Sequence, residues 1–197
     1  MPSRLRLGVT GARGFIGSKL TQAALDAGHE VHTFCRSSWT GVPFVPRACR
    51  HQLTLPDAPD PRDLEGLDAL IHLAVAPHGS SEETSFAVNV TGTVRLQEAA
   101  AAAGVERFIF VSTQSAHDGA RNRYGRSKRA AERALDRRQG VMILRPGLVY
   151  DGSENGLLGR SAKAAAKLGV FPVVGGDRAM VQTLWFDDLV SVLLRFA

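Results

Sequence analysis

Cysteine is scarce in this chain of 197 residues, which contains only Cys35 and Cys49. Two cysteines are too few for a disulfide framework. The sequence also lacks an apolar run long enough for a membrane span, and nothing ahead of the first predicted strand resembles a secretory signal peptide. These absences predict a protein of the reducing cytoplasm with no membrane partner.

A metal site is not expected either, although four residues of ligand type lie close in sequence. These residues are His32, Cys35, Cys49 and His51. Neighbouring residues of a strand alternate between its faces, so His32 and Cys35 should point in opposite directions. The sequence therefore predicts no metal centre.

The chain also lacks a long block of like charge, despite a formal net charge of +5. The basic residues are scattered or form short clusters, such as the one at residues 121–129, without interleaved aromatic residues or a known nucleic-acid reading module. We therefore expect no nucleic acid partner. Attraction to an anionic cofactor or small-molecule substrate explains the positive charge more simply.

Short apolar runs alternate with helical patterns along the chain. Strands are predicted at residues 4–9, 30–35, 50–53, 70–75, 108–111 and 141–144, and helices at 15–27, 85–103 and 124–137. A short helical turn is also predicted at residues 64–67. This alternation predicts an α/β protein with a Rossmann-type doubly wound parallel sheet and helices on both faces.

A glycine-rich turn, T-G-A-R-G-F-I-G at residues 10–17, joins the first predicted strand to the first predicted helix. Gly11 would bend the chain, Gly14 would let the backbone approach a pyrophosphate, and Gly17 would let the helix pack on the strand. The helix N-terminus would offer free N–H groups to the phosphates. Glycines also collect in turns for conformational reasons alone, but the strand-turn-helix context favours a dinucleotide site.

The end of the second strand indicates which dinucleotide is preferred. About 20 residues beyond the turn, a site for NAD tends to carry Asp or Glu for the ribose 2′-hydroxyl, and residues 34–38 contain neither. Arg36, with Ser37 and Arg13, would instead bind a 2′-phosphate, which favours NADP over NAD. The alternative is that Arg36 is a solvated loop residue.

Tyr124 and Lys128 form a Y-x-x-x-K pattern at the start of a predicted helix, one turn apart on the same face. A nearby ammonium group would lower the pKa of the tyrosine toward neutrality and make it a general acid or base. Thr113 lies in a hydroxyl-rich stretch directly after a predicted strand, where it would bind a substrate oxygen. The structural alternatives are that Tyr124 and Lys128 form an ordinary pair on the helix surface, and that Thr113 is an ordinary turn residue.

Together these residues resemble the extended short-chain dehydrogenase/reductase superfamily, specifically its NAD-dependent epimerase/dehydratase branch. The matching motifs occur in order along nearly the whole chain. They lie at residues 10–17, 72–75, 89–93, 110–113, 124–128, 145–150 and 186–189.

This resemblance implies Thr113 as the catalytic serine or threonine, Tyr124 as the acid/base and Lys128 as its electrostatic partner, which also holds the cofactor ribose. Asn89 resembles a buried architectural asparagine. The cofactor-binding residues implied by the motifs are Gly11, Arg13, Gly14, Phe15, Ile16, Gly17, Arg36, Ser37, Gln52 near the adenine, Leu73, Ala74, Ala76, Lys128, and Pro146 with Gly147 near the nicotinamide.

Some features depart from the family pattern. Only ten residues separate Thr113 from Tyr124, Gln52 replaces the usual adenine-site aspartate, and the chain ends soon after Asp188. We therefore expect a dinucleotide-binding domain over residues 1–150 and a small, incomplete substrate lobe over residues 151–197, packed on the same domain. Asp187 or Asp188 should cap the last helix.

The resemblance implies an NAD(P)-dependent oxidoreductase, epimerase or dehydratase that acts on a carbonyl or a secondary alcohol. A nucleotide sugar is one candidate substrate and a homodimer is one candidate assembly. The alternative is a non-catalytic NAD(P)-binding sensor or assembly subunit.

Overall fold

The computed structural model describes residues 4–36, 45–46, 49–136, 140–153, 156–169 and 181–197. Ser37 and the end of the helix predicted at 124–137 lie outside the described residues.

Six parallel strands form one sheet in the order β3-β2-β1-β4-β5-β6. They are β1 (Arg6–Thr10), β2 (Glu30–Cys35), β3 (Arg50–Gln52), β4 (Ala69–His72), β5 (Arg107–Val111) and β6 (Val141–Leu144). The sheet confirms the predicted doubly wound fold. The strand order reverses between β1 and β4, and ligands of such sheets bind beyond the carboxyl ends of the strands at this point.

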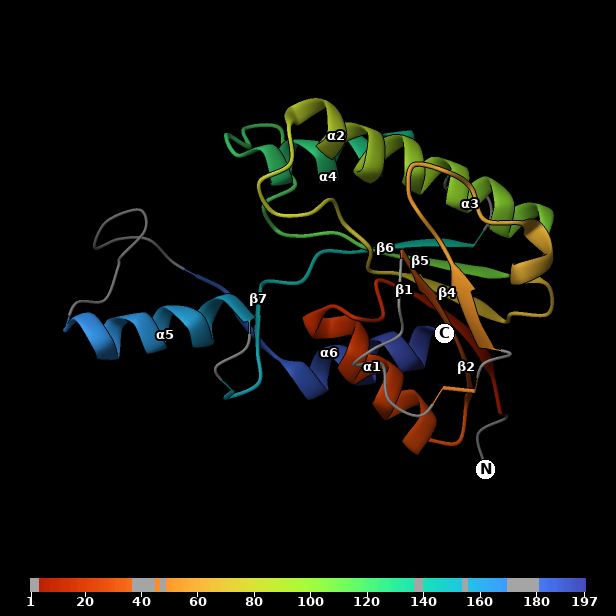
Figure 1. Ribbon diagram of the computed structural model, residues 1–197, viewed down its shortest axis with the longest axis horizontal. Helices are drawn as coiled ribbons and strands as arrows, with labels where there is room; N and C mark the ends of the chain where they lie inside the picture. The colour runs from red at the N-terminus through yellow and green to blue at the C-terminus, as the bar shows by residue number, and fades with distance from the viewer. Residues whose placement is uncertain (1–3, 37–44, 47–48, 137–139, 154–155, 170–180) are drawn as a thin grey trace.

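Helices cover both faces of the sheet (Figure 1). One face carries α1 (Phe15–Asp26) and α6 (Phe186–Phe196). The other carries α2 (Glu82–Phe86), α3 (Gly92–Ala102) and α4 (Arg123–Ala134). Each face has its own apolar core, as expected for a parallel sheet buried on both sides.

The helix predicted at 85–103 begins earlier than expected and is not regular. Ser81 caps α2 by accepting a hydrogen bond from the Thr84 N–H, so helical structure begins at Glu82. A π-helical segment, Ala87–Thr91, separates α2 from α3. The predicted turn at 64–67 is a 3-10 helix at Pro61–Leu64, three residues earlier.

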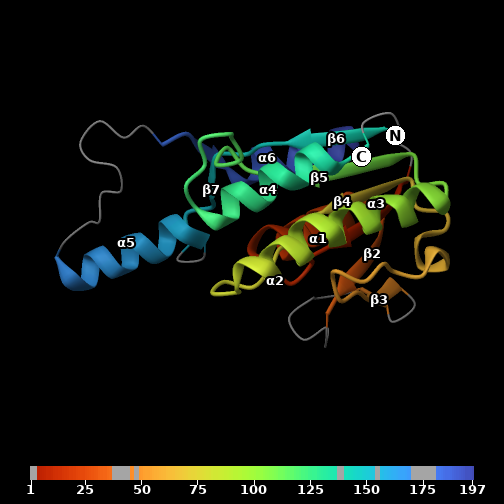
Figure 2. The same cartoon turned by 90° about the horizontal axis from the view of Figure 1, so that it is seen from above.

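Beyond residue 147 the chain adds a small parallel sheet of β7 (Leu148–Tyr150) and β8 (Thr183–Trp185). Helix α5 (Gly156–Leu168) projects away from the sheet and its helix layers (Figure 2). In contrast, α6 packs into the same core as α1. The described residues include no helix long and apolar enough to cross a membrane.

The expectation that Asp187 or Asp188 caps the last helix is wrong. Trp185 occupies the N-cap position of α6, and no side chain supplies a capping hydrogen bond. Both aspartates are exposed in the first turn. Asp187 instead accepts a hydrogen bond from the indole Nε1 of Trp185 at 3.1 Å. The two carboxylates still lie at the positive end of the helix dipole.

Candidate functional site

The glycine-rich turn follows β1 and leads directly into α1. Gly11 has a φ of +68°, and a Cβ there would lie 2.8 Å from the backbone N of Ala74. A Cβ on Gly17 would lie 2.2 Å from the Gly11 carbonyl oxygen. Gly14, the N-cap of α1, is exposed and has an unstrained φ of −71°. The first and third glycines are therefore needed for packing, whereas the second leaves the helix N-terminus open.

A series of buried side-chain hydrogen bonds links the start of this turn to β4 and α3. Thr10 Oγ1 lies 2.7 Å from His72 Nδ1 and accepts from the backbone N–H groups of residues 73 and 74. His72 Nε2 lies 3.0 Å from Thr93 Oγ1, which itself donates to the carbonyl oxygen of Asn89. Burial holds the pKa of His72 well below its usual value. The neutral ring therefore donates from Nε2 to Thr93 and accepts at Nδ1 from Thr10.

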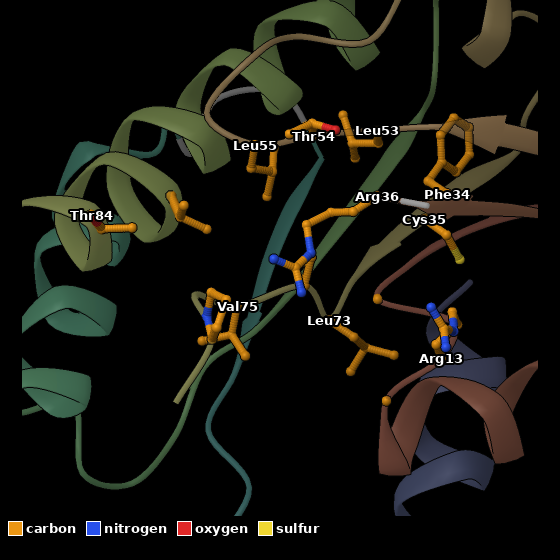
Figure 3. Close-up of a pocket in the computed structure, with 15 residues that line it drawn as sticks. Arg13, Phe34, Cys35, Arg36, Leu53, Thr54, Leu55, Leu73, Val75 and Thr84 are labelled. Atoms are coloured by element: carbon orange, nitrogen blue, oxygen red, sulfur yellow. The ribbon is translucent and has the colours of Figure 1, made fainter. Parts of the chain in front are cut away.

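A pocket of about 590 Å³ opens beside the turn at the carboxyl edge of the sheet (Figure 3). Its volume falls in the range of roughly 300 to 1,000 Å³ found for small-molecule sites. The structure brings together six of the predicted cofactor-binding residues in its lining, namely Gly11, Arg13, Gly14, Arg36, Leu73 and Ala74.

Two guanidinium groups give this pocket a positive character. The Arg36 side chain extends from the end of β2 into the pocket, toward Leu73 and Val75 (Figure 3). Arg13 lies beside Cys35, whose thiol pKa is raised by burial, so the thiol stays neutral at pH 7. No acidic side chain occurs among the described residues that line the pocket. The pocket is suited to an anionic ligand.

Several predicted residues lie outside the pocket lining. Phe15 packs against Phe186 of α6, with ring centroids 6.1 Å apart, and Ile16 packs against the core on that side of the sheet. Gly17 is buried under the turn. Gln52 lies next to the lining, where its amide Nε2 donates to the carbonyl oxygen of Arg36 at 3.5 Å.

The remaining predicted residues take part in backbone connections around the site. The N–H of Ala76 donates to Asn89 Oδ1 at 2.8 Å. Pro146 and Gly147 join β6 to β7, and the Pro146 carbonyl oxygen accepts from the N–H of Gln114 at 3.2 Å. A Cβ on Gly147 would lie 2.2 Å from the carbonyl oxygen of Gln182, so only glycine fits this crossing.

Tyr124 and Lys128 both lie on α4, but their surroundings differ. Tyr124 is 44% exposed, whereas Lys128 is buried. Lys128 Nζ donates to the carbonyl oxygen of Val111 at 2.8 Å and lies 4.3 Å from the centroid of the Phe110 ring. Burial lowers the pKa of Lys128 to about 7 and raises the pKa of Tyr124. The expected lowering of the tyrosine pKa by the lysine is therefore absent.

The buried Asn89 connects the pocket wall to the helix that carries Tyr124. Its Oδ1 accepts from the N–H of Ala76, and its Nδ2 donates to Ser127 Oγ at 2.9 Å. Ser127 in turn donates to the carbonyl oxygen of Tyr124. Asn89 lies in the π-helical segment, and its two hydrogen bonds join this segment to residue 76 and to α4.

Thr113 follows β5 and is partly buried, and its Oγ1 accepts from the N–H of Ser115 at 3.2 Å. The preceding Ser112 donates to Oε1 of Glu132 at 2.6 Å. Glu132 is fully buried, and its carboxylate also pairs with Arg145 and Arg129. This buried ionic cluster holds the end of β5 against α4.

The lining also contains residues that the sequence motifs do not mark. Phe34 and residues 53–55 lie at or just beyond the ends of β2 and β3, so their positions at strand ends were a usable signal. Thr84 of α2 and Val88 of the π-helical segment also line the pocket. No local pattern marks these two residues.

The strand order, the glycine-rich turn and the pocket at the switch point define a Rossmann-fold protein. The sequence matches the model of the NAD dependent epimerase/dehydratase family over residues 7–197, and the chain belongs to that family.

Two relatives and one solved structure illustrate the likeness. The chain is 28% identical to a 3β-hydroxysteroid dehydrogenase/Δ5→4-isomerase of Mycobacterium tuberculosis, over 94% of this chain and 58% of that protein. It is 31% identical to a ceramide reductase of Caulobacter vibrioides, over 95% and 59%. It superposes with a TM-score of 0.77 on a UDP-glucuronic acid 4-epimerase of Bacillus cereus in complex with NAD, at 20% identity, over 96% and 73%. The chain therefore spans less than two thirds of the length of the two sequence relatives.

Proposed function

We propose that this protein binds NADP in the pocket beside the glycine-rich turn and uses it in oxidoreductase chemistry on a carbonyl or secondary alcohol. The observation that carries the proposal is the lining of the pocket, where the glycine-rich turn and two arginines meet and no described acidic side chain is present. Family membership supports a nicotinamide dinucleotide as the ligand.

NADP is favoured over NAD because of Arg36 and Arg13. The 2′-phosphate carries negative charge and acceptor oxygens that guanidinium groups bind well, whereas a site for the free 2′-hydroxyl typically offers a carboxylate. Arg36 extends into the pocket from the end of β2, the position at which that carboxylate would stand. Gln52 supports the Arg36 backbone from the neighbouring strand.

Bound NADP or NADPH accepts or supplies the hydride. Tyr124 would donate a proton to the carbonyl oxygen during reduction, or accept the hydroxyl proton during oxidation. Thr113 would orient that oxygen by a hydrogen bond. Because Lys128 contacts Val111 and Phe110, its role in this scheme is to fix α4, the helix that carries Tyr124, against the end of β5.

Replacement of Tyr124 by phenylalanine tests the chemical part of the proposal. Tyr124 is 44% exposed, and no hydrogen bond joins its hydroxyl to the described residues. Tyr124→Phe should therefore keep dinucleotide affinity and lose turnover by about 100-fold or more, the usual contribution of a positioned acid or base. Turnover is measured by NADPH absorbance with a panel that includes a 3β-hydroxysteroid and a UDP-sugar. Glu98→Gln, at an exposed position of α3, is the control.

The two alternatives give different results in this experiment. Equal turnover of a substrate by the wild type and by Tyr124→Phe would remove Tyr124 from the mechanism. Tight dinucleotide binding without turnover of any carbonyl or alcohol would favour the sensor or assembly subunit. The nucleotide sugar and the homodimer stay predictions, tested by this panel and by sedimentation.

A further inference from the structure

Three side chains of metal-ligand type converge on β2 and β3, outside the pocket lining. Glu30 and His32 lie on β2, and Cys49 directly precedes β3. One carboxylate oxygen, one imidazole nitrogen and Sγ all lie within 4.8 Å of one another. His32 is buried, and the other two residues are partly buried.

The four residues of ligand type that lie close in sequence, His32, Cys35, Cys49 and His51, are a different set. Cys35 is buried in the core on the α1 side and Cys49 packs against the same core, but Cys49 is the cysteine whose Sγ lies with Glu30 and His32. His32 stacks on His51, which also stacks on Phe34. The predicted alternation of faces therefore agrees with the structure, and Cys35 does not join the cluster. Glu30 lies two residues before His32 on the same face of β2, and it joins His32 and Cys49 in the cluster instead of Cys35.

Hydrogen-bond counting shows that two neutral imidazole rings leave one of the cluster's three polar contacts without a proton. Three contacts form a chain: Glu30 Oε1 to His32 Nε2 at 3.0 Å, His32 Nδ1 to His51 Nε2 at 2.9 Å, and His51 Nδ1 to Asp63 Oδ1 at 3.1 Å. Two neutral imidazole rings carry only two N–H groups. If these serve the His32–His51 and His51–Asp63 contacts, a lone pair of His32 faces the Glu30 carboxylate.

We propose that Glu30, His32 and Cys49 bind a zinc ion, with His51 and Asp63 as outer partners that orient His32. A carboxylate, an imidazole and a thiolate are all zinc ligands. Bond lengths of about 2.0 to 2.3 Å place ligand atoms of a tetrahedral zinc roughly 3 to 4 Å apart. Small side-chain movements therefore suffice to close the site, and a water molecule takes the fourth position.

The chain from His32 through His51 to Asp63 is the second observation in favour of a metal. A histidine that binds zinc through one nitrogen commonly donates from the other to a carboxylate, a carbonyl or another polar group, which fixes its tautomer. Here Nδ1 of His32 faces His51, and Asp63 holds His51 in the same way. In the tautomer in which His32 Nδ1 donates to His51, Nε2 is unprotonated and directed at Glu30.

Two arginines and one proton compete with the metal. Arg6 Nε contacts Glu30 Oε1 at 3.1 Å, and Arg4 Nη2 contacts Oε2 at 3.4 Å. Both arginine side chains are more than 40% exposed, so they can turn toward water or keep one carboxylate oxygen while zinc takes the other. Burial and the nearby Glu30 raise the pKa of the Cys49 thiol. Zinc must therefore release that thiol proton to solvent when it binds.

A zinc ion here would fasten the edge strand β3 to β2. The register pairs Arg50 with Thr33, so Cys49 lies level with His32 across the two strands. Residues 53–55 follow β3 directly and line the pocket. Zinc would thus stabilise the strand that carries one wall of the pocket, and it contacts no residue of the proposed proton transfer.

The test is a zinc titration of the reduced protein in competition with a chromophoric chelator, with and without single substitutions. One zinc per chain is expected. Cys49→Ser and His32→Gln should weaken binding by at least 100-fold, and His51→Gln by about 10-fold, as for other outer partners. Cys35→Ser is the matched control and should bind zinc like the wild type. Far-ultraviolet circular dichroism checks that each variant folds.

Cobalt provides a spectroscopic readout that does not depend on the chelator competition. The wild type loaded with Co²⁺ should show a thiolate-to-cobalt charge-transfer band, and Cys49→Ser should lack it while Cys35→Ser keeps it. The proposal is overturned if the wild type binds no stoichiometric zinc, if the cobalt band is absent, or if the two cysteine variants behave alike. Because none of the three ligands lines the pocket, these results leave the dinucleotide proposal untouched.

Discussion

Lys128 donates a hydrogen bond from Nζ to the carbonyl oxygen of Val111 at 2.8 Å, and this contact joins α4 to the end of β5 inside the protein. The Phe110 ring lies 4.3 Å from the same ammonium group. Glu132 attracts the charge from the next turn of the helix, but burial has the larger effect and lowers the pKa of Lys128 to about 7. A neutral lysine is therefore well populated at physiological pH.

This buried lysine should make the stability of the protein depend on pH. In the unfolded chain its pKa returns to 10.5. The unfolded state then binds more protons than the folded state between pH 7 and 10.5, so the free energy of unfolding rises with pH in that window. Relative to Lys128→Met, the wild type should gain about 2 kcal/mol between pH 7 and pH 9.

Urea unfolding of both proteins at the two pH values measures this difference, and the other titrating groups cancel because both proteins contain them. A wild type that gains no stability relative to Lys128→Met would show that Lys128 keeps an ordinary pKa. The ammonium group would then have access to water that the geometry does not provide.

The first and third glycines of the turn should be far less replaceable than the second. A Cβ on Gly17 would lie 2.2 Å from the Gly11 carbonyl oxygen, which is backbone and cannot turn aside. Gly17→Ala should therefore destabilise the protein by about 3 kcal/mol. On the exposed Gly14, the nearest atom would be 3.1 Å away. Gly14→Ala should cost less than about 1 kcal/mol.

Thermal or urea unfolding of the two alanine variants, side by side, provides the comparison. The dinucleotide affinity of each variant is a second measurement, because Gly14 lines the pocket and Gly17 does not. Equal stability losses would mean that the turn can relax around Gly17 and that its packing role has been misjudged.

Removing the buried carboxylate of Glu132 should destabilise the fold and disturb the end of β5. Glu132→Gln would leave Arg145 and Arg129 without their shared anion and weaken the hydrogen bond from Ser112. We expect a loss of about 3 kcal/mol, the lower end for a broken buried ion pair, because Arg145 can reach water.

Arg133→Gln is the control on the same helix. Its exposed pairing with Asp118 should contribute less than about 1 kcal/mol. If the two substitutions had similar effects on the free energy of unfolding, the cluster around Glu132 would be no stronger than a surface ion pair.

Much of this fold follows from local patterns in the sequence. The bounds of β2 and β6 agree with their apolar runs, and the turn at residues 10–17 joins a strand to a helix as its glycines indicate. Such elements can be predicted because period, turn chemistry and capping are local properties. The order of the six strands does not follow from these local patterns, because right-handed connections also allow other doubly wound orders.

Other features depend on contacts between distant segments. The π-helical segment places Asn89 between Ala76 and Ser127, and no local pattern marks it. The contacts of the Lys128 ammonium group are also set by distant segments, although the Y-x-x-x-K spacing predicted that it would be a partner for Tyr124. Tertiary packing instead directs its ammonium group to Val111. Sequence spacing gives the face of a helix, but the neighbours on that face come from the whole fold.

The most direct test of the account is a pair of dinucleotide titrations on the wild type and on Arg36→Ala, followed by the fluorescence of NADPH and NADH. The wild type should bind NADPH more tightly than NADH. Arg36→Ala should weaken NADPH binding by roughly 10- to 100-fold, the loss of a charge-assisted hydrogen bond, and leave NADH binding nearly unchanged. Equal affinities for the two dinucleotides, unaffected by Arg36→Ala, would contradict the phosphate-binding role of Arg36, and a failure to bind either would contradict the assignment of the pocket.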